Sequence, residues 1–385
     1  MKALQEFAAR IPGDPAPVPG RFAFVLHPLV IADFARKFGV LRFAPPRALE
    51  WVARFVPPVV ASHITGIRSV AGATAEGWFI GLPLTTRVLL ESRPEFVYDR
   101  LVQCGHLAER LGARILGLGA FAKVVGDAGV TVAERLPIAV TTGNSYTAAS
   151  AVEGALLAAG RMEIDLPRAH ALVVGATGAI GAVCSQMLAP HVGVLTLLAR
   201  NVERLESLAA KIRAAREDGR VPEVRVTTDV RRAVADADLT ITVSSATDVL
   251  IQPDDLRPGA VVCDVARPRN VSRLVYEKRD DVLVIDGGVI EVPGEVEFGL
   301  DFGFPPRTGE ACMAETMILA LEGRYEDYTV GRDITLARVQ EIDALARRHG
   351  FRVAGFRRFE RAISEEEIAR IKTSAARRAL ASFRA

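Results

Sequence analysis

The chain has few of the residues that would support several common kinds of site. Its 385 residues include only four cysteines, Cys104, Cys184, Cys263 and Cys312, and no two of them form a CxxC pair. This spacing gives no disulfide framework and no zinc site, and no other cluster of His, Cys and carboxylate residues has the spacing of metal ligands. We therefore expect reduced thiols and no bound metal.

Long apolar runs and a strong net charge are also absent. No stretch approaches 18 uninterrupted apolar residues, so no transmembrane helix is predicted. The first ten residues, MKALQEFAAR, contain an acidic residue and no apolar run of signal-peptide length, so we expect a cytoplasmic protein. The net charge of +2 gives no indication of nucleic acid as a partner. Peripheral membrane contact and the oligomeric state stay open.

Hydrophobic residues make up 50% of the chain, enough for large cores and roughly two or three domains. The alternation of apolar runs with helical segments predicts an α/β protein with a Rossmann-type, doubly wound nucleotide-binding domain. We place an N-terminal α/β substrate domain at 1–145, the nucleotide-binding domain at 146–300 and a helical C-terminal segment at 301–385. The Gly/Pro-rich stretch 291–309 is expected to be a loop.

The strongest local signal lies between His170 and Arg204. A short apolar run ends at Gly175, a glycine-spaced turn follows, and a helix-like segment leads to a second apolar run, 194–199. Strand, turn, helix and strand in this order form the first unit of a dinucleotide-binding fold, in which backbone amides at the helix start hold a pyrophosphate. The residues of this turn that are expected to contact the cofactor are Gly175, Thr177, Gly178, Ala179, Ile180 and Gly181.

The end of the second apolar run indicates which dinucleotide binds. NAD-binding chains place an acidic residue there for the ribose 2′-hydroxyl, whereas this chain has Arg200 and Asn201, with Arg204 one helical turn on. A guanidinium group pairs with a 2′-phosphate, so NADPH is the predicted cofactor. Ser245 follows a later strand and is also expected at the cofactor, because ligands bind at the carboxyl ends of parallel strands.

Cys312 is the candidate nucleophile. It follows a Pro/Gly loop and lies in the first turn of a predicted helix, 310–322, where the partial positive charge of the helix start stabilises a thiolate. A thiolate can take the acyl group of a thioester and hold it for reduction by a nicotinamide. Most buried cysteines are instead small hydrophobes of the core, and position alone leaves both interpretations open.

The stretch 141–147, TTGNSYT, comes just before the nucleotide-binding unit. Its hydroxyls and amide suit either an N-cap cluster or a hinge that lines the cleft. Thr142 and Asn144 are candidates for orienting the nicotinamide or a substrate carbonyl. His27 and Tyr146 are candidates for the acid that protonates a leaving thiol.

Several dispersed stretches carry a family resemblance. In chain order they are LGAFAKVVGD (118–127), TTGNSYTA (141–148), VVGATGAIGAVC (173–184), LLARNVERL (197–205), ACMAETMILALEG (311–323) and GRDIT with RHGF (331–351). Together they resemble the long-chain acyl-(acyl-carrier-protein) reductases of the cyanobacterial type, which reduce fatty acyl thioesters to aldehydes. The resemblance implies NADPH as cofactor, Cys312 as nucleophile, and an acyl carrier protein or coenzyme A thioester as substrate. The N-terminal domain is then expected to hold the acyl chain in an apolar channel.

Two other functions stay open. TTGNSYTA is also similar to the domain junction of shikimate dehydrogenases, which would make the chain a hydroxy–keto oxidoreductase with Lys123 as base and Asp127 beside it. The N-V-T-x-P-x-K segment that supplies such a lysine is not found. The third hypothesis is a non-catalytic NADP-binding protein, and Cys312 at a helix start counts against it.

Overall fold

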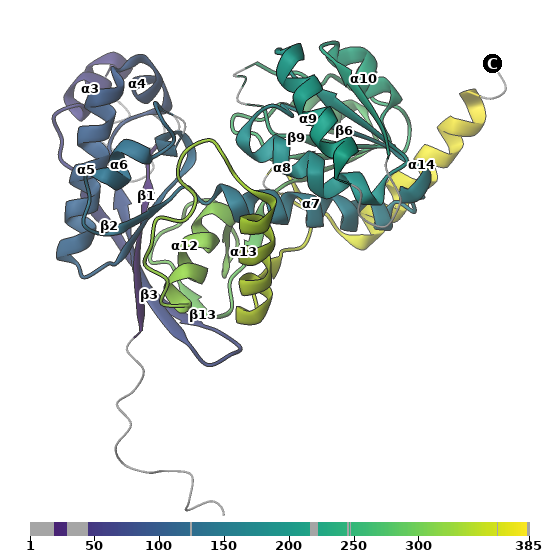
Figure 1. Ribbon diagram of the computed structural model, residues 1–385. Helices are drawn as coiled ribbons and strands as arrows, with labels where there is room; N and C mark the ends of the chain where they lie inside the picture. Colours follow the sequence, from purple (N-terminus) through teal and green to yellow (C-terminus); the bar gives the residue numbers. More distant parts are fainter. Residues whose placement is uncertain are drawn as a thin grey trace, which may run out of the picture.

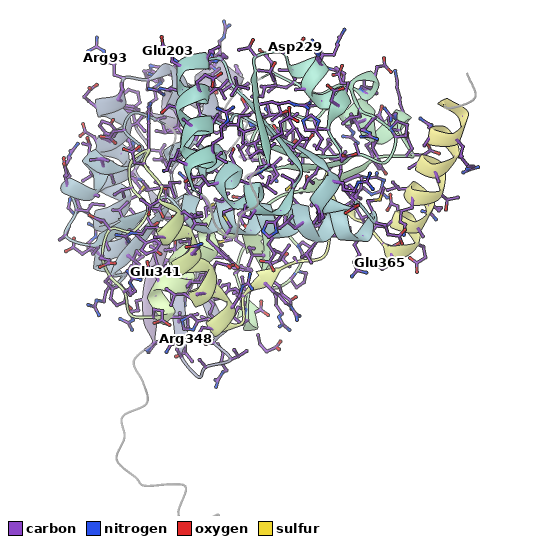
Figure 2. The ribbon with its side chains drawn as sticks, turned by 45° about the vertical axis from the view of Figure 1, so that its right-hand side comes forward. Arg93, Glu203, Asp229, Glu341, Arg348 and Glu365 are labelled. Atoms are coloured by element: carbon purple, nitrogen blue, oxygen red, sulfur yellow. The ribbon has the colours of Figure 1, made fainter. Side chains whose placement is uncertain are left out.

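The computed structural model describes residues 19–28, 45–123, 125–215, 222–244, 246, 248–359 and 361–382. They form two six-stranded sheets with helices packed on them, and helix α7 (Asn144–Arg161) runs from one half of the molecule along the other (Figure 1). Charged side chains such as Arg93, Glu203 and Glu365 point outward (Figure 2). None of the described helices is long and apolar enough to cross a bilayer.

The first sheet has the strand order β13-β2-β3-β1-β4-β5. Four of its six strands, β3, β1, β4 and β5, run parallel, and β2 pairs antiparallel with β3. Large apolar side chains on the central strands, among them Phe22, Phe24 and Phe79, are fully or almost fully buried and form the core. The strands are β1 (Gly20–Leu26), β2 (Val59–Arg68), β3 (Thr74–Gly81), β4 (Ile115–Leu118) and β5 (Ala139–Thr141).

Helices cover this sheet and connect its strands. The longest, α5, begins at Pro94 in its first position, where the missing N–H costs nothing, and it carries Glu95 in the first turn and Arg110 in the last, in agreement with the helix dipole. Its apolar face, with Val97, Leu101 and Cys104, is buried. The helices of this half are α3 (Pro46–Ala53), α4 (Thr86–Glu91), α5 (Pro94–Arg110) and α6 (Val130–Glu134).

The second sheet is entirely parallel, with the order β11-β10-β9-β6-β7-β8. Counted from β6, this is the order 3-2-1-4-5-6 of a dinucleotide-binding fold, so the predicted Rossmann-type domain is confirmed. Because the strands run parallel, their carboxyl ends share one edge. The strands are β6 (His170–Val174), β7 (Val194–Leu198), β8 (Glu223–Thr227), β9 (Leu239–Thr242), β10 (Val261–Asp264) and β11 (Leu283–Asp286).

Side-chain caps fix where two helices of this domain begin. The Asn201 side chain accepts the Arg204 N–H at the start of α9, and the Asp229 side chain accepts the Arg232 N–H at the start of α10. Helix α7 packs against α8 and against strands β9 and β10. The helices of the domain are α8 (Ala179–Leu188), α9 (Val202–Ala214), α10 (Val230–Asp236) and α11 (Arg273–Lys278).

After β11 the chain returns to the first sheet. It does so before residue 300, where the nucleotide-binding domain was expected to end. Strand β13 (Gly294–Glu297) pairs with β2, and β14 (Thr308–Glu310) pairs with β12 (Val289–Glu291), so the expected loop 291–309 contains two strands. Glycine makes this close pairing possible: a β-carbon on Gly294 would lie 2.3 Å from the carbonyl oxygen of Gly66.

The C-terminal segment joins both halves instead of standing apart. Helix α12 (Ala311–Leu321) is buried along its whole length and packs on β1 and β4 of the first sheet and on α7. Helix α13 (Leu336–His349) also packs on α7, and α14 (Glu365–Ser382) follows three short strands. These strands are β15 (Arg352–Val353), β16 (Arg357–Arg358) and β17 (Arg361–Ala362).

Candidate functional site

The glycine turn lies at the carboxyl end of β6, where the fold places a dinucleotide. Gly175 has φ +88°, and a β-carbon there would lie 2.9 Å from the backbone nitrogen of Ser244. A β-carbon on Gly181 would lie 2.2 Å from the carbonyl oxygen of Gly175, so helix and turn approach closely only without side chains. Gly178 is the exposed N-cap of α8. The residues present therefore fit a pyrophosphate at this helix start.

The second strand supplies the residues expected at the ribose. Arg200 and Arg204 lie just beyond β7 and in the first turn of α9, and both are exposed. Neither guanidinium forms an ion pair or hydrogen bond with another residue that the structure describes. Asn201 caps α9, so its side-chain oxygen is already used by the Arg204 N–H at 2.8 Å. Ser245 lies outside the described residues.

Cys312 is the second residue of α12 and is 4% exposed. Its Sγ lies 3.6 Å from Oε2 of Glu310, the residue at the N-cap, and donates a hydrogen bond to that carboxylate. No sequence pattern singled out Glu310 beforehand. The Cys312 thiol therefore lies in the first turn of a helix with a carboxylate beside it that can accept its proton.

The turn 141–147 meets Cys312 directly, although the two are far apart in the chain. Gly143, with φ +73°, packs so closely that a β-carbon on it would lie 2.4 Å from Cβ of Cys312. The next residue, Asn144, is 8% exposed, and its Oδ1 has no hydrogen-bond partner among the described residues. Thr142 is fully buried and donates its hydroxyl to the carbonyl of Thr329 at 2.8 Å. The Thr142 hydroxyl is therefore already used as a donor, whereas the side-chain oxygen of Asn144 can still accept a hydrogen bond.

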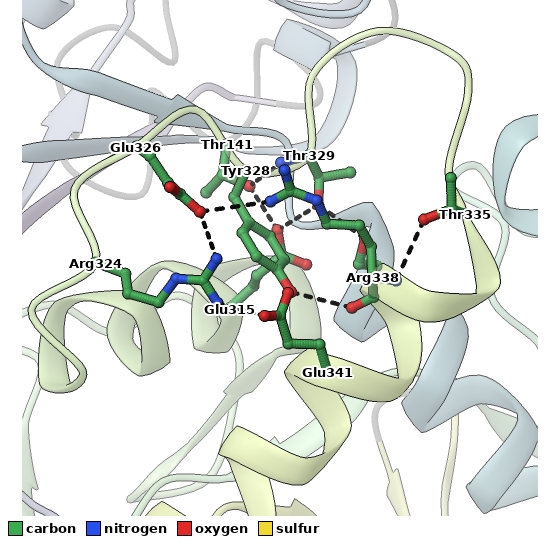
Figure 3. A network of polar contacts seen from close by, with 10 residues as sticks. Thr141, Glu315, Arg324, Glu326, Tyr328, Thr329, Thr335, Arg338 and Glu341 are labelled. Atoms are coloured by element: carbon green, nitrogen blue, oxygen red, sulfur yellow. Dashed lines mark hydrogen bonds and ion pairs between the residues drawn. The ribbon is translucent and has the colours of Figure 1, made fainter.

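A buried carboxylate fastens this turn to the cysteine helix. Glu315, one helical turn after Cys312 and fully buried, accepts the hydroxyls of Thr141 and Thr329 (Figure 3). Its other oxygen accepts the N–H of Tyr146 at 2.8 Å. The residues on both sides of Gly143 are thus held by one side chain of α12. Thr329 connects the cluster to the outer group of Tyr328, Arg324, Arg338, Glu326 and Glu341 in the same view.

The other three cysteines lie in plainer surroundings. Cys104, Cys184 and Cys263 are fully buried. Burial raises the pKa of the Cys104 thiol to about 12 and that of Cys184 to about 12, and it also raises the pKa of Cys263. None of the three is therefore suited to act as a thiolate near neutral pH.

The candidate acids and bases differ in how far they are already engaged. His27 accepts the N–H of Phe121 at its Nε2, at 3.0 Å. Tyr146 is 2% exposed, and burial together with the carboxylates of Glu153 and Asp343 raises the pKa of its phenol. Asp127 accepts two hydrogen bonds from Thr131. The side chain of Lys123 lies outside the described residues.

The N-terminal half, which is expected to hold the acyl chain in an apolar channel, brings its apolar segments only partly together. Strands β1 and β4 pair side by side, with Phe22, Phe24 and Ile115 buried in the core. The stretch 52–60 lies instead on the surface, with Val52 49% and Phe55 69% exposed. Its apolar side chains thus lie at the outside of the N-terminal half and not beside Cys312.

Comparisons with known proteins agree with the nucleotide-binding part. Residues 157–286 match the model of the shikimate/quinate 5-dehydrogenase family. A long-chain acyl-[acyl-carrier-protein] reductase from Synechococcus elongatus is 29% identical over 334 residues, which cover 83% of this chain and 94% of the reductase. A Serratia protein named aminotransferase PigE is 32% identical over 370 residues; they cover 91% of this chain but only 42% of PigE. This chain therefore spans less than half the length of PigE.

Among solved structures, quinate dehydrogenase from Corynebacterium glutamicum in complex with NAD aligns over 85% of this chain and 99% of its own, with 12% identity and a TM-score of 0.36. The family match and the sequence relatives carry the conclusion. The chain has a nucleotide-binding domain of the shikimate/quinate 5-dehydrogenase type, and its cofactor is a nicotinamide dinucleotide. Together these findings support a nicotinamide-dependent oxidoreductase.

Proposed function

We propose that the protein reduces a long-chain fatty acyl thioester to the fatty aldehyde, with NADPH as reductant and Cys312 as the residue that carries the acyl group. The observation that carries this proposal is the position of Cys312. Its thiol lies at the start of a buried helix, beside the Glu310 carboxylate and against Gly143 at the junction of the two halves. The likeness to the Synechococcus reductase over most of both chains supports the same function.

In this mechanism Glu310 takes the thiol proton of Cys312, 3.6 Å away, and the thiolate attacks the thioester carbonyl. The bond from the acyl carbon to the carrier sulfur breaks, and Glu310 returns the proton to the leaving carrier thiolate. The acyl group is then bonded to Cys312. The nicotinamide cofactor, when bound, supplies a hydride to an acyl carbon. Breaking of the bond between that carbon and the Cys312 sulfur releases the aldehyde and regenerates the thiolate.

Asn144 would stabilise the oxygen of the thioester carbonyl as negative charge develops on it. Its side chain is buried and follows the residue that packs on Cys312; its unpartnered atom in the described part of the chain is the acceptor Oδ1, so the donor to the oxyanion would be its Nδ2 group. An amide N–H directed at a developing oxyanion lowers the barrier of acyl transfer by several kcal/mol in well-studied enzymes. Thr142 would act indirectly, by holding Thr329 and so the turn itself.

The deciding experiment uses a radiolabelled long-chain acyl thioester in the absence of NADPH. Wild-type protein should accumulate a hydroxylamine-sensitive acyl label, and Cys312→Ala should not. Cys104→Ala is the matched control, because it also removes a buried thiol from a helix but should keep the label. In a separate assay with NADPH present, aldehyde production by Cys312→Ala near the wild-type rate would show that hydride attacks the thioester directly.

The length of the acyl chain is a separate part of the proposal. Each buried methylene contributes about 0.8 kcal/mol, so activity should rise steeply with chain length before it levels off. Thioesters of graded length, on both acyl carrier protein and coenzyme A, would identify the substrate and its carrier. A flat response from short to long chains would argue against a long-chain substrate.

The family match at 157–286 favours one second candidate, a shikimate- or quinate-type hydroxy–keto oxidoreductase. Lys123 would be its base, with Asp127 nearby. Asp127 accepts two hydrogen bonds from Thr131 at Oδ2, whereas its Oδ1 has no partner among the described residues. Reduction of NADP by the protein in the presence of shikimate or quinate, without activity on acyl thioesters, would establish this alternative. Cofactor binding with no turnover of either substrate class would indicate a non-catalytic protein.

A further inference from the structure

The segment between α12 and α13 rises between the two halves of the molecule (Figure 1) and reaches the nucleotide-binding helix. A cavity of about 440 Å³ is lined on one side by Thr177, Gly178 and Ala179, the start of α8. On the other side it is lined by residues 332–336. The chain thus places a second, distant segment opposite the turn that holds the cofactor.

The charges around this cavity suit an anion. Arg332 and Lys211 line it as cations, and Asp333 is the carboxylate among its lining residues. The first N–H groups of α8 have no partner within the helix, so they and the two cations present donors from three elements. A dinucleotide places its pyrophosphate at this helix start. The partial positive charge of the backbone amides is smaller than the negative charge of the pyrophosphate, so a cationic side chain would add to the binding.

Arg332 is also fixed to the other half of the molecule. One of its guanidinium nitrogens donates to the carbonyl of Gly126 at 2.9 Å, in the turn before α6 of the first sheet's half. A guanidinium has five N–H donors in a planar fork, so the remaining donors are available while this bond is kept. One side chain can therefore contact a ligand of the nucleotide-binding domain and the N-terminal half at the same time.

We propose that Arg332 is a cofactor-binding residue that contacts the pyrophosphate of the dinucleotide and, through Gly126, links cofactor binding to the position of the N-terminal half. The segment 331–335 then covers the cofactor once it is bound. This inference rests on the nicotinamide cofactor and not on thioester reduction, so it can fail or hold independently of the proposed substrate.

The test compares Arg332→Gln with wild-type protein by fluorescence titration of NADPH and of adenosine 2′-monophosphate. Loss of a charged hydrogen bond to the pyrophosphate should weaken NADPH binding about 10-fold or more. The monophosphate lacks a pyrophosphate, so its affinity should stay within twofold. Arg332→Lys should recover part of the NADPH affinity. Arg110→Gln, an exposed arginine at the end of α5, is the matched control and should bind like wild type.

Hydrogen exchange adds a readout of the link between the halves. In wild type, NADPH should slow exchange of the backbone amides around 126–132, and in Arg332→Gln this slowing should be lost. The proposal is overturned if Arg332→Gln binds NADPH as tightly as wild type. It is also overturned if both ligands weaken equally, because Arg332 would then contact the 2′-phosphate instead of the pyrophosphate.

Discussion

Gly143 lies directly against Cys312: a β-carbon on Gly143 would be 2.2 Å from Cα and 2.5 Å from the carbonyl oxygen of Cys312. These are backbone atoms of a helix that is buried on all sides, so they cannot move aside. The residue before the nucleotide-binding half thus forms part of the surroundings of the candidate nucleophile. The contact links the turn 141–147 to the chemistry proposed for α12.

Gly143→Ala should therefore be strongly destabilising. The new methyl group would clash with Cys312, and φ +73° is strained for alanine, so we expect the free energy of unfolding to fall by about 2 kcal/mol or more. Denaturant unfolding measures this loss. Gly160→Ala, in the last turn of α7 with open space around it, should instead be neutral or stabilising by about 0.5–1 kcal/mol. Equal stability of Gly143→Ala and wild type would contradict the close contact.

Glu315→Gln tests the buried carboxylate that holds the same turn. A glutamine can still accept the two hydroxyls through Oε1, but its amide would face the Tyr146 N–H, which then loses its acceptor. A buried donor left without a partner costs about 1–3 kcal/mol, so unfolding should become easier by that amount. Alkylation of Cys312 by iodoacetamide should also change in rate, because the turn against it is released.

The matched control for this variant is Glu326→Gln, which removes a carboxylate from the exposed part of the cluster in Figure 3. Its side chain is 55% exposed, and exposed ion pairs contribute less than about 1 kcal/mol. Iodoacetamide should react with Cys312 at the wild-type rate in this control. A similar loss of stability in both variants would mean that the hydrogen bond from Tyr146 to Glu315 contributes no more to stability than an exposed ion pair.

The nucleotide-binding half was predictable because its signals are local. Gly175, Gly178 and Gly181 repeat at a fixed spacing between a strand and a helix, and the structure places them in the expected turn. The run of parallel strands follows from apolar segments separated by helices, each short enough to identify alone. The position of Cys312 in the first turn of a helix also followed from the preceding Gly/Pro-rich stretch.

The surroundings of Cys312 could not be predicted in the same way. Thr141 and Glu315 are 174 residues apart, and no periodicity relates two residues at such a distance. Strand β13 was missed because glycines allow it to pair at a sheet edge, where the sequence indicated only a loop. Arg332 carried a signal only as part of the GRDIT stretch, whose role needs the fold to bring it opposite Gly178.

Arg200→Asp tests the choice of NADPH over NADH. Arg200 and Arg204 are exposed at the carboxyl end of β7, and a carboxylate at position 200 would repel a 2′-phosphate and accept a 2′-hydroxyl. Affinity for NADPH should fall at least about 10-fold while NADH binds as well or better, as measured by fluorescence titration. Arg168 lies just before β6, at the amino ends of the parallel strands and so away from the cofactor turn. Arg168→Asp should leave both affinities unchanged. Unchanged NADPH affinity in Arg200→Asp would remove this residue from the cofactor site.

His349 gives the protein a stability that depends on pH. The side chain is 2% exposed; its Nδ1 lies 2.8 Å from Oγ of Ser69, and its Nε2 lies 2.8 Å from Oε1 of Glu322. Burial lowers the pKa of His349, although Glu322 partly opposes this shift. The folded protein therefore binds a proton at His349 less readily than the unfolded chain, whose histidine has a pKa of about 6.5.

The sign of the effect follows from this difference. Above pH 6.5 both states have a neutral His349, so its contribution to stability is fully present. As the pH falls below about 6.5, the unfolded chain takes up the proton first, and the free energy of unfolding should fall by at most about 1.4 kcal/mol for each pH unit from this residue. Urea unfolding of wild type and His349→Gln between pH 7.5 and 5 measures it, and the variant should show a shallower decline. Parallel curves for the two proteins would mean that His349 binds its proton equally well in both states, against the lowered pKa.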